Sequence, residues 1–413
     1  MKVTGYRSLT TAHDWGRPIG DANGVMPGPH TDVHVLILET DGGLEGVGLG
    51  AHGDIDRVFG AVEGEDPRAV PALYDRMIDR VFKTGHSGAT FGAIGAIDMA
   101  LWDLKAKAAG EPLWRTLGGR DRFVPGYASG LDIALDDDAL VGLYERFADR
   151  GFSAGKLKGG RDLGHDLRRL EALRDVLGRN SAHPALMFDA NESWNRSQAV
   201  RFVSALERVV DLAWIEEPVR RWDAAGLAAV RRGIRAGVAT GENLTGLEQY
   251  RPLLDADAVD VVQVGNVWGI THFLRVAAVA HGRDLPVSPV AYHANPVAHA
   301  AVAVPNHLAF EVQDLSAPIG LEVDQEFQDG GIVLGDEPGL GIRVDEEHIR
   351  AVRAADPPAA TAGPHVRPGR AGLRLVPDGP RPDGAQPVGA HRDSAYQDDA
   401  HRDGRAGVPA RSR

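Results

Sequence analysis

From about Val124 onward, short apolar segments alternate with amphipathic segments of helical periodicity. We predict strands at 154–158, 185–189, 212–216, 237–242, 259–264 and 286–290, and helices at 167–177, 197–209, 225–234, 247–254 and 270–280. Strands joined through helices run parallel, because each helix carries the chain back to the same edge. So many repeated units favour closure into a (β/α)-barrel over an open sheet. No Gly-x-Gly-x-x-Gly turn follows an early strand, so the sequence does not support a dinucleotide-binding fold.

The segments on either side of this repeat differ from it in the spacing and number of their apolar residues. Val33, Val35 and Ile37 recur at every second residue, which is strand spacing, and the apolar residues of 89–109 recur every three or four residues, which is helix spacing. The predicted fold class is therefore α/β, a barrel preceded by a small α+β unit. We expect this unit over 1–123, the barrel over 124–320, a return segment packed on the first unit over 321–353, and a disordered tail over 354–413, where apolar clusters are almost absent.

Three acidic residues end successive predicted strands of the barrel. They are Asp189, Glu216 and Glu242, at intervals of 27 and 26 residues, close to one strand–helix unit each. Such spacing places them side by side at the end of the barrel where active sites form, and three oxygen ligands suit a hard cation such as Mg²⁺. Each acid alone is better explained as a helix cap or a solvated residue, but the matched intervals favour a metal site. Asn191 follows on the same rim, where it either binds substrate or caps the next helix.

Two lysines lie on the strand that precedes these acids. Lys156 and Lys158 are separated by one residue, so both side chains point to the same side of the strand, toward the mouth of the barrel. Adjacent ammonium groups lower each other's pKa, and we expect one of them to serve as a base near neutral pH. The alternative is a pair of surface lysines, which an inward-facing strand disfavours.

Charge and composition exclude several classes of function. The net charge is −13, which argues against nucleic acid or an anionic membrane as the main partner. The chain has no cysteine, so thiol catalysis and cysteine-ligated metal sites are excluded. The first residues, 1–4, contain no apolar signal core, and no stretch is long and apolar enough to span a bilayer, so we expect a cytoplasmic enzyme.

These motifs, in this order, resemble those of the enolase superfamily, mandelate racemase subgroup. The resemblance covers roughly residues 1–350 and rests on the segments 93–104, 156–158, 188–191, 214–218 and 240–243. It implies a capping α+β domain over the barrel and one Mg²⁺ per subunit held by Asp189, Glu216 and Glu242. It also implies a small-molecule carboxylate substrate and a homo-oligomer, either a dimer or an octamer.

The resemblance also assigns roles to individual residues. Lys158 would remove the proton next to the substrate carboxylate, giving an enediolate that the metal stabilises, with Lys156 as its electrostatic partner. Asp260 matches an aspartate that orients an acid–base histidine, and Glu311 matches a glutamate that contacts the substrate carboxylate. The histidine itself is displaced, since Pro289 and Val290 occupy the expected place. His293 is the nearest replacement, and it is either catalytic or a loop histidine facing solvent.

Dehydration of a sugar acid, an aldonate or aldarate, to a 2-keto-3-deoxy acid is the reaction we expect first. It needs one base, whereas a racemase or epimerase needs two bases on opposite faces of the α-carbon, and the displaced histidine weakens that pairing. A racemase, epimerase or cycloisomerase that uses Lys158 and His293 remains the alternative. A catalytically silent binding protein would lack a ligand or the base, and none is missing. Arg17 and His30, in or near the polar segment 14–23, are expected to contact the far end of the substrate.

Overall fold

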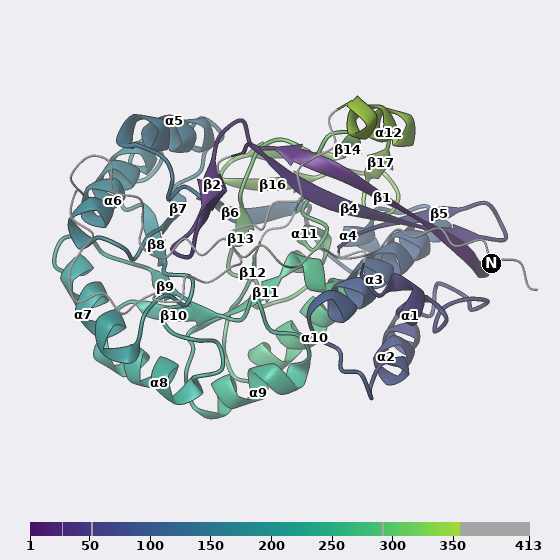
Figure 1. Ribbon diagram of the computed structural model, residues 1–413, viewed down its shortest axis with the longest axis horizontal. Coiled ribbons are helices and arrows are strands. Elements are labelled where there is room, and N and C mark those ends of the chain that lie inside the picture. The colour runs from purple at the N-terminus through teal and green to yellow at the C-terminus, as the bar shows by residue number, and fades with distance from the viewer. Residues whose placement is uncertain (27, 51–52, 291–292, 356–413) are drawn as a thin grey trace, which may run out of the picture. The chain divides into compact units, whose positions relative to one another are not determined.

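The N-terminal part of the protein is a small antiparallel sheet covered by helices. The computed structural model describes residues 1–26, 28–50, 53–290 and 293–355. The sheet has the order β1 (Val3–Asp14), β4 (His30–Thr40), β5 (Glu45–Leu49), and the hairpin of β2 (Ile19–Gly20) and β3 (Val25–Met26) extends from it (Figure 1). The helices are α1 (Ile55–Phe59), α2 (Val70–Arg80), α3 (Gly88–Ala109) and α4 (Leu113–Thr116).

Helix α3 packs directly on strand β5, and the sequence of β5 explains how. A Cβ atom at Gly48 would lie 1.9 Å from the carbonyl oxygen of Ala96, and one at Gly46 would lie 2.3 Å from that of Ala100. Only glycine allows the two backbones to approach this closely. The helix ends at Ala109 and is capped by Gly110, whose φ of 71° lies in the left-handed region that glycine adopts readily.

The central part is a barrel of parallel strands. Its strands are β6 (Phe123–Ser129), β7 (Ala154–Lys158), β8 (Ala185–Asp189), β9 (Trp214–Glu216), β10 (Gly237–Thr240), β11 (Val261–Gly265), β12 (Val287–Val290) and β13 (Phe310–Val312). Each strand from β6 to β11 pairs in parallel with the next one, and β13 pairs in parallel with β6. The bridge between Val287 and His307 joins β12 to the segment before β13, which completes the barrel.

Helices connect the barrel strands and surround them (Figure 1). They are α5 (Asp137–Ala148), α6 (Leu163–Leu177), α7 (Arg196–Leu206), α8 (Ala224–Gly233), α9 (Leu247–Asp255), α10 (Ile270–His281) and α11 (Ala298–Ala301), with a short 3₁₀ turn over Asn266–Trp268. The predicted (β/α)-barrel is thus confirmed. One helix start differs from the sequence expectation: α7 is capped by Asn195, whose side chain accepts the Gln198 N–H, because Asn195 and Gln198 form a capping box.

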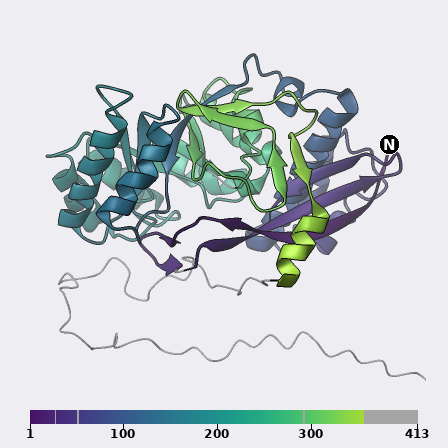
Figure 2. The same cartoon turned by 90° about the horizontal axis from the view of Figure 1, so that it is seen from above.

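The chain after the barrel contacts both the barrel and the N-terminal sheet. The antiparallel hairpin of β15 (Gln325–Gln328) and β16 (Gly331–Leu334) pairs with the barrel strand β6. Strands β14 (Leu321–Val323) and β17 (Ile342–Val344) pair with each other, and α12 (Glu346–Ala355) lies along β1 (Figure 2), where Arg7 and Glu346 form an ion pair at 2.7 Å. The domain boundaries stay predictions, and the expected tail falls almost wholly outside the described residues.

Membrane insertion has no structural support in the described ranges. None of the helices there combines the length and the apolar character that crossing a bilayer requires.

Candidate active site

The three predicted metal ligands lie at one end of the barrel. Asp189 is the last residue of β8, Glu216 is the last residue of β9, and Glu242 follows the end of β10 by two residues. Asp189 and Glu216 are register partners on adjacent strands, and Lys158 is the register partner of Asp189 on the other side. Parallel pairing therefore places the acids and the lysine strand along a single rim.

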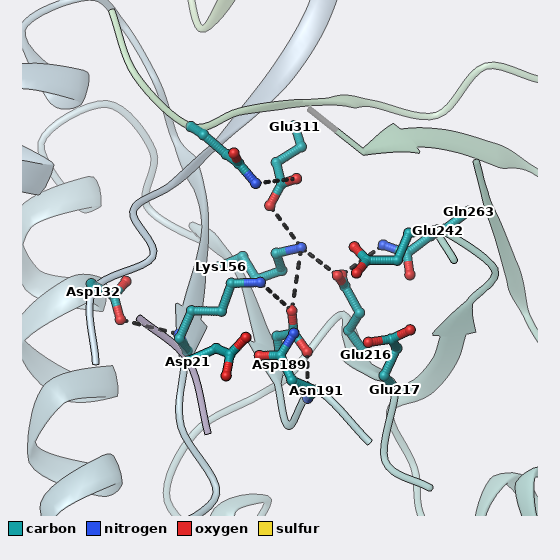
Figure 3. Close-up of polar contacts among 12 residues, drawn as sticks. Asp21, Asp132, Lys156, Asp189, Asn191, Glu216, Glu217, Glu242, Gln263 and Glu311 are labelled. Atoms are coloured by element: carbon teal, nitrogen blue, oxygen red, sulfur yellow. Dashed lines mark hydrogen bonds and ion pairs between the residues drawn. The ribbon is translucent and has the colours of Figure 1, made fainter. Parts of the chain in front are cut away.

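The two lysines of β7 contact the acids directly (Figure 3). Lys156 is fully buried, and its Nζ lies 2.8 Å from Oε1 of Glu311, 3.8 Å from Oδ2 of Asp189, and in hydrogen-bond contact with Oε1 of Glu216. Lys158 is 2% exposed and donates to Oδ2 of Asp189. The alternation of side chains along β7 explains why both reach the cluster.

Carboxyl groups outnumber ammonium groups in this cluster. Burial raises the pKa of the Glu216 carboxyl to about 8, and it also raises the pKa values of Glu217 and Glu242. Asp189 differs, because the ammonium groups of Lys158 and Lys156 overcome its burial and hold its pKa below the ordinary value. For these glutamates, burial and the repulsion among the carboxylates outweigh the compensation that the two lysines supply.

The expected lowering of the lysine pKa values is wrong in this structure. Burial alone would lower the pKa of Lys158, but the Asp189 carboxylate outweighs both burial and the neighbouring Lys156, so that pKa is raised. For Lys156, burial is opposed by Glu216 and Glu311, and its pKa is also raised. The mutual repulsion of two ammonium groups is smaller than their attraction to the surrounding acids.

The donor set suits a divalent cation. Carboxylate oxygens are the ligands that Mg²⁺ prefers, and buried carboxyl groups with raised pKa values mark negative charge that a cation would stabilise. In the described ranges, no three acidic or histidine side chains already converge on a common point. Asp189 and Glu216 turn instead toward the lysines. The residues fit the metal by their chemistry, and their role as ligands stays a prediction.

A buried network that the sequence analysis missed supports the lysine strand. Asp132, in the loop after β6, accepts from Lys158 N–H (3.2 Å), from Tyr144 OH (2.6 Å) and from Arg169 Nη2 (2.8 Å). Arg169 also donates to the Lys158 carbonyl at 2.9 Å, and Tyr144 OH contacts the Lys156 carbonyl. A signal for Arg169 exists in the sequence, because it shares the apolar face of its helix with Leu173 and Leu177.

The expected pairing of Asp260 with His293 is wrong. Asp260 precedes β11, so it lies at the opposite end of the barrel from the acids, where it binds Arg231 Nε at 2.8 Å and Val238 N–H at 2.9 Å. His293 follows β12 and packs against His13 of β1, with ring centroids 4.6 Å apart. Nε2 of His13 lies 3.1 Å from Oδ2 of Asp314. The capping strand β1 therefore supplies one aromatic neighbour of His293, and Trp15, directly after that strand, supplies another.

A cavity of about 690 Å³ opens above the acids and Lys158. Its described lining residues are Trp15, Ile19, Asp21, Asn23, Met26, Thr31, Asp32, Leu131, Lys158, Asn191, Glu192, Glu217, Arg221, Trp222, Glu242, Asn243, Gly265, Asn266, Val267, Trp268, Val290, His293 and Gln313. Lys156 is absent from this set, so of the two lysines Lys158 alone belongs to the described lining. His293 lies on the wall, which removes the alternative of a loop histidine pointing into bulk solvent.

Arg17 and His30 do not line this cavity, contrary to expectation. Arg17 is drawn away by the Gly130 carbonyl, to which it donates, and by the ring of Trp15, 5.7 Å from its guanidinium carbon. His30 lies 3.6 Å from Asp14 on the exposed part of the capping strands. Asn191 does line the cavity, and Asn195 rather than Asn191 caps α7, so the capping alternative for Asn191 is wrong.

Comparison with known proteins assigns the chain to a family. Residues 18–118 match the model of the mandelate racemase / muconate lactonizing enzyme N-terminal domain, and residues 139–348 match the enolase C-terminal domain-like model. The chain belongs to the mandelate racemase and muconate lactonizing enzyme family of the enolase superfamily. The sequence resemblance to this family is thereby confirmed.

Relatives of this enolase-superfamily member carry several activities. It is 35% identical to a 3,6-anhydro-alpha-L-galactonate cycloisomerase of Streptomyces coelicolor over 70% of this chain and 80% of the relative. It is 33% identical to an L-talarate/galactarate dehydratase of Salmonella typhimurium over 81% of this chain and 86% of the relative. A solved structure of a Streptomyces coelicolor racemase with bound magnesium has a TM-score of 0.77 and 31% identity, covering 84% of this chain and 99% of that one.

Proposed function

We propose that this protein is a Mg²⁺-dependent dehydratase of sugar acids, with Lys158 as the base. The observation that carries the proposal is the position of Lys158, which lines the cavity and donates to Asp189, while Lys156 stays buried among acids. Asp189, Glu216 and Glu242 would hold the metal. When bound, Mg²⁺ supplies positive charge that stabilises the negative charge developing on the substrate carboxylate. Dehydratases and a magnesium-bound structure among the relatives support this reading.

The reaction converts a 2,3-dihydroxy carboxylate into a 2-keto-3-deoxy acid and water. In the structure Asp189 holds the Lys158 ammonium in its protonated form, and this hold would weaken when Asp189 binds the metal. The neutral amine of Lys158 would then take the proton from the α-carbon, after which the C3–OH bond breaks. The departing hydroxide needs a proton, which the newly formed Lys158 ammonium can return on the same face. The enol that remains takes up a proton at C3 and becomes the keto acid. Lys156 forms an ion pair with Glu311 at 2.8 Å, which holds the Lys156 ammonium in place next to the reacting groups.

The environment of His293 favours dehydration over racemisation. Burial, reinforced by the adjacent His13, lowers the pKa of His293 to about 3. A group with so low a pKa is a poor second base at neutral pH, because proton transfer to it is unfavourable. It can still donate a hydrogen bond as neutral imidazole. A one-base reaction through Lys158 therefore fits this cavity better than a two-base racemisation.

A cycloisomerase is the second candidate. The 35% identical relative with that activity supports it, and the same proton abstraction by Lys158 would begin the reaction. The two outcomes differ in what leaves, because a cycloisomerase expels or adds an oxygen of the substrate itself and releases no water.

Both candidates are tested by incubating the protein and Mg²⁺ with a library of mono- and dicarboxylic sugar acids in ²H₂O. A 2-keto-3-deoxy product that forms with native protein and not with Lys158→Ala supports the dehydratase. Isomerisation without that product supports the cycloisomerase. Deuterium exchange that persists in Lys158→Ala would contradict the role of Lys158 in either case. The cytoplasmic location and the homo-oligomeric state also remain proposals, and gel filtration with light scattering tests the latter.

A further inference from the structure

The hairpin of β2 and β3 lies at the mouth of the cavity and is tied to the barrel on three sides. Its bonds are Gly20 N–H to the Leu131 carbonyl (2.8 Å), Arg161 to the carbonyls of Asp21 (2.9 Å) and Ala22 (3.1 Å), and Asn23 Nδ2 to the Asn191 carbonyl (3.0 Å). These partners come from the loops after β6, β7 and β8. These bonds hold the tip of the hairpin in place, and none of them uses the Asp21 side chain.

The side chain of Asp21 lies on the cavity wall together with Lys158 and Asn191. Figure 3 shows its carboxyl group on the side of the cluster where Asp189 and Asn191 lie. Its backbone neighbour Asn23 donates an N–H to Oδ1 at 2.6 Å, which keeps the carboxyl group oriented. Burial raises the pKa of Asp21, and the Asn23 N–H and the Lys158 ammonium oppose that rise. The Asp21 carboxyl group thus interacts electrostatically with the ammonium group of Lys158, the proposed base.

The basic side chains on the cavity wall are few and already engaged. Among the lining residues that the structure describes, they are Lys158, Arg221 and His293. Arg221 forms an ion pair with Glu192 and donates to the Asn243 carbonyl at 3.4 Å. Burial leaves His293 neutral at pH 7. A second carboxylate on a substrate would therefore meet Asp21 and no uncommitted cation within the described wall.

We propose that Asp21 is a specificity residue that accepts hydrogen bonds from the substrate's hydroxyl groups and repels a second carboxylate. The preferred substrate is then a polyhydroxy monocarboxylate of the aldonate class rather than an aldarate. This inference rests on the proposed function, because it presumes that the first carboxylate binds among the acids that would hold the metal. Like charges placed together at a desolvated site disfavour binding strongly, whereas hydroxyl groups are good donors to a carboxylate.

The test compares matched acids that differ only at the far end. The probes are galactonate with galactarate, gluconate with glucarate, and mannonate with mannarate, each with Mg²⁺ present. Binding is measured by tryptophan fluorescence, since Trp15, Trp222 and Trp268 line the cavity. We expect the monocarboxylate of the best-bound pair to bind about tenfold more tightly or better. Asp21→Asn removes the charge and keeps the acceptor for Asn23, so it should reduce that preference to less than about threefold.

Controls separate this inference from the proposed function. Asp211→Asn changes an exposed aspartate that precedes β9, outside the cavity, and should leave the preference unchanged. Binding is repeated in the Lys158→Ala background, where turnover cannot contribute. A dicarboxylate that binds as tightly as its partner, a preference unchanged by Asp21→Asn, or no binding by any pair would each overturn the inference. Absence of turnover with an intact binding preference would contradict the dehydratase alone.

Discussion

Nη2 of Arg169 lies 2.8 Å from Oδ1 of Asp132, and both side chains are fully buried beneath the strand that carries the lysines. The pair holds the strand backbone at Lys158, because Asp132 accepts a hydrogen bond from the Lys158 N–H and Arg169 donates one to the Lys158 carbonyl. The salt bridge between Arg169 and Asp132 therefore helps to position Lys158, the proposed base. Breaking it affects both stability and the position of the Lys158 ammonium.

Arg169→Met is expected to destabilise the protein by about 3–5 kcal/mol, because it leaves the buried Asp132 carboxylate without its cation. Chemical denaturation measures the change. The matched control is Arg168→Met on the same helix, where the guanidinium is exposed and donates to the Gly164 carbonyl. A loss of stability equal to that of the control would contradict the supporting role of Arg169.

Tyr144→Phe is expected to lower kcat about tenfold while KM changes little. Tyr144 is outside the described cavity lining, and it orients the lysine strand through Asp132 and the Lys156 carbonyl. Stability should fall by about 1 kcal/mol for the lost hydrogen bonds. Steady-state kinetics on the substrate found by the library assay measures kcat and KM separately. Tyr74→Phe, at a buried tyrosine of α2, should leave kcat unchanged. A rise in KM alone would argue that Tyr144 acts on binding instead.

Mg²⁺ is expected to raise the melting temperature, because it binds the folded protein and relieves the excess of buried carboxyl charge. Glu242→Gln should weaken Mg²⁺ binding at least about tenfold, or about 1.4 kcal/mol. Isothermal titration calorimetry measures both proteins. Glu248→Gln serves as the comparison, since Glu248 is exposed and pairs with His86. Equal affinities in the two variants would remove Glu242 from the ligand set.

Acid should destabilise the protein through its buried histidines. Burial lowers the pKa of His299 to about 4, so the unfolded chain, with an ordinary pKa near 6.5, binds that proton first. The stability contributed by neutral His299 is complete above pH 6.5 and is lost as pH falls toward 4, by up to about 3 kcal/mol.

His299→Gln should therefore lose less stability than native protein between pH 7 and pH 4.5. Urea denaturation across that range compares the two slopes, and His183→Gln, at an exposed histidine, should follow the native slope. Parallel curves for His299→Gln and native protein would show that the ring is not buried in its neutral form.

His293→Gln should lower kcat/KM, but the plot of kcat/KM against pH should keep its shape between pH 5 and pH 8. The reason is that the pKa of His293 lies near 3, so the ring does not titrate in that range. The profile of kcat/KM against pH for both proteins provides the measurement. Loss of an acidic limb near pH 6.5 in the variant would mean that His293 gains and loses a proton during turnover.

Local sequence patterns were enough to predict the barrel and the row of acids on its rim. Parallel strands joined by helices repeat at a near-constant interval, so Asp189 and Glu216 had to become neighbours. Alternation along β7 likewise placed Lys156 and Lys158 on the same side. These conclusions need only local periodicity and the rule that parallel strands end at a common edge.

Which side chains share the site depends on tertiary contacts that the sequence patterns do not reveal. The two lysines differ because Lys156 is covered by Glu216 and Glu311 while Lys158 reaches the cavity. Asp21 enters from a distant hairpin, and His293 packs against His13 of β1 and against Trp15. Such contacts join segments far apart in the chain, and they depend on loop paths and on the competition among neighbouring charges. Local periodicity carries no information about either of these.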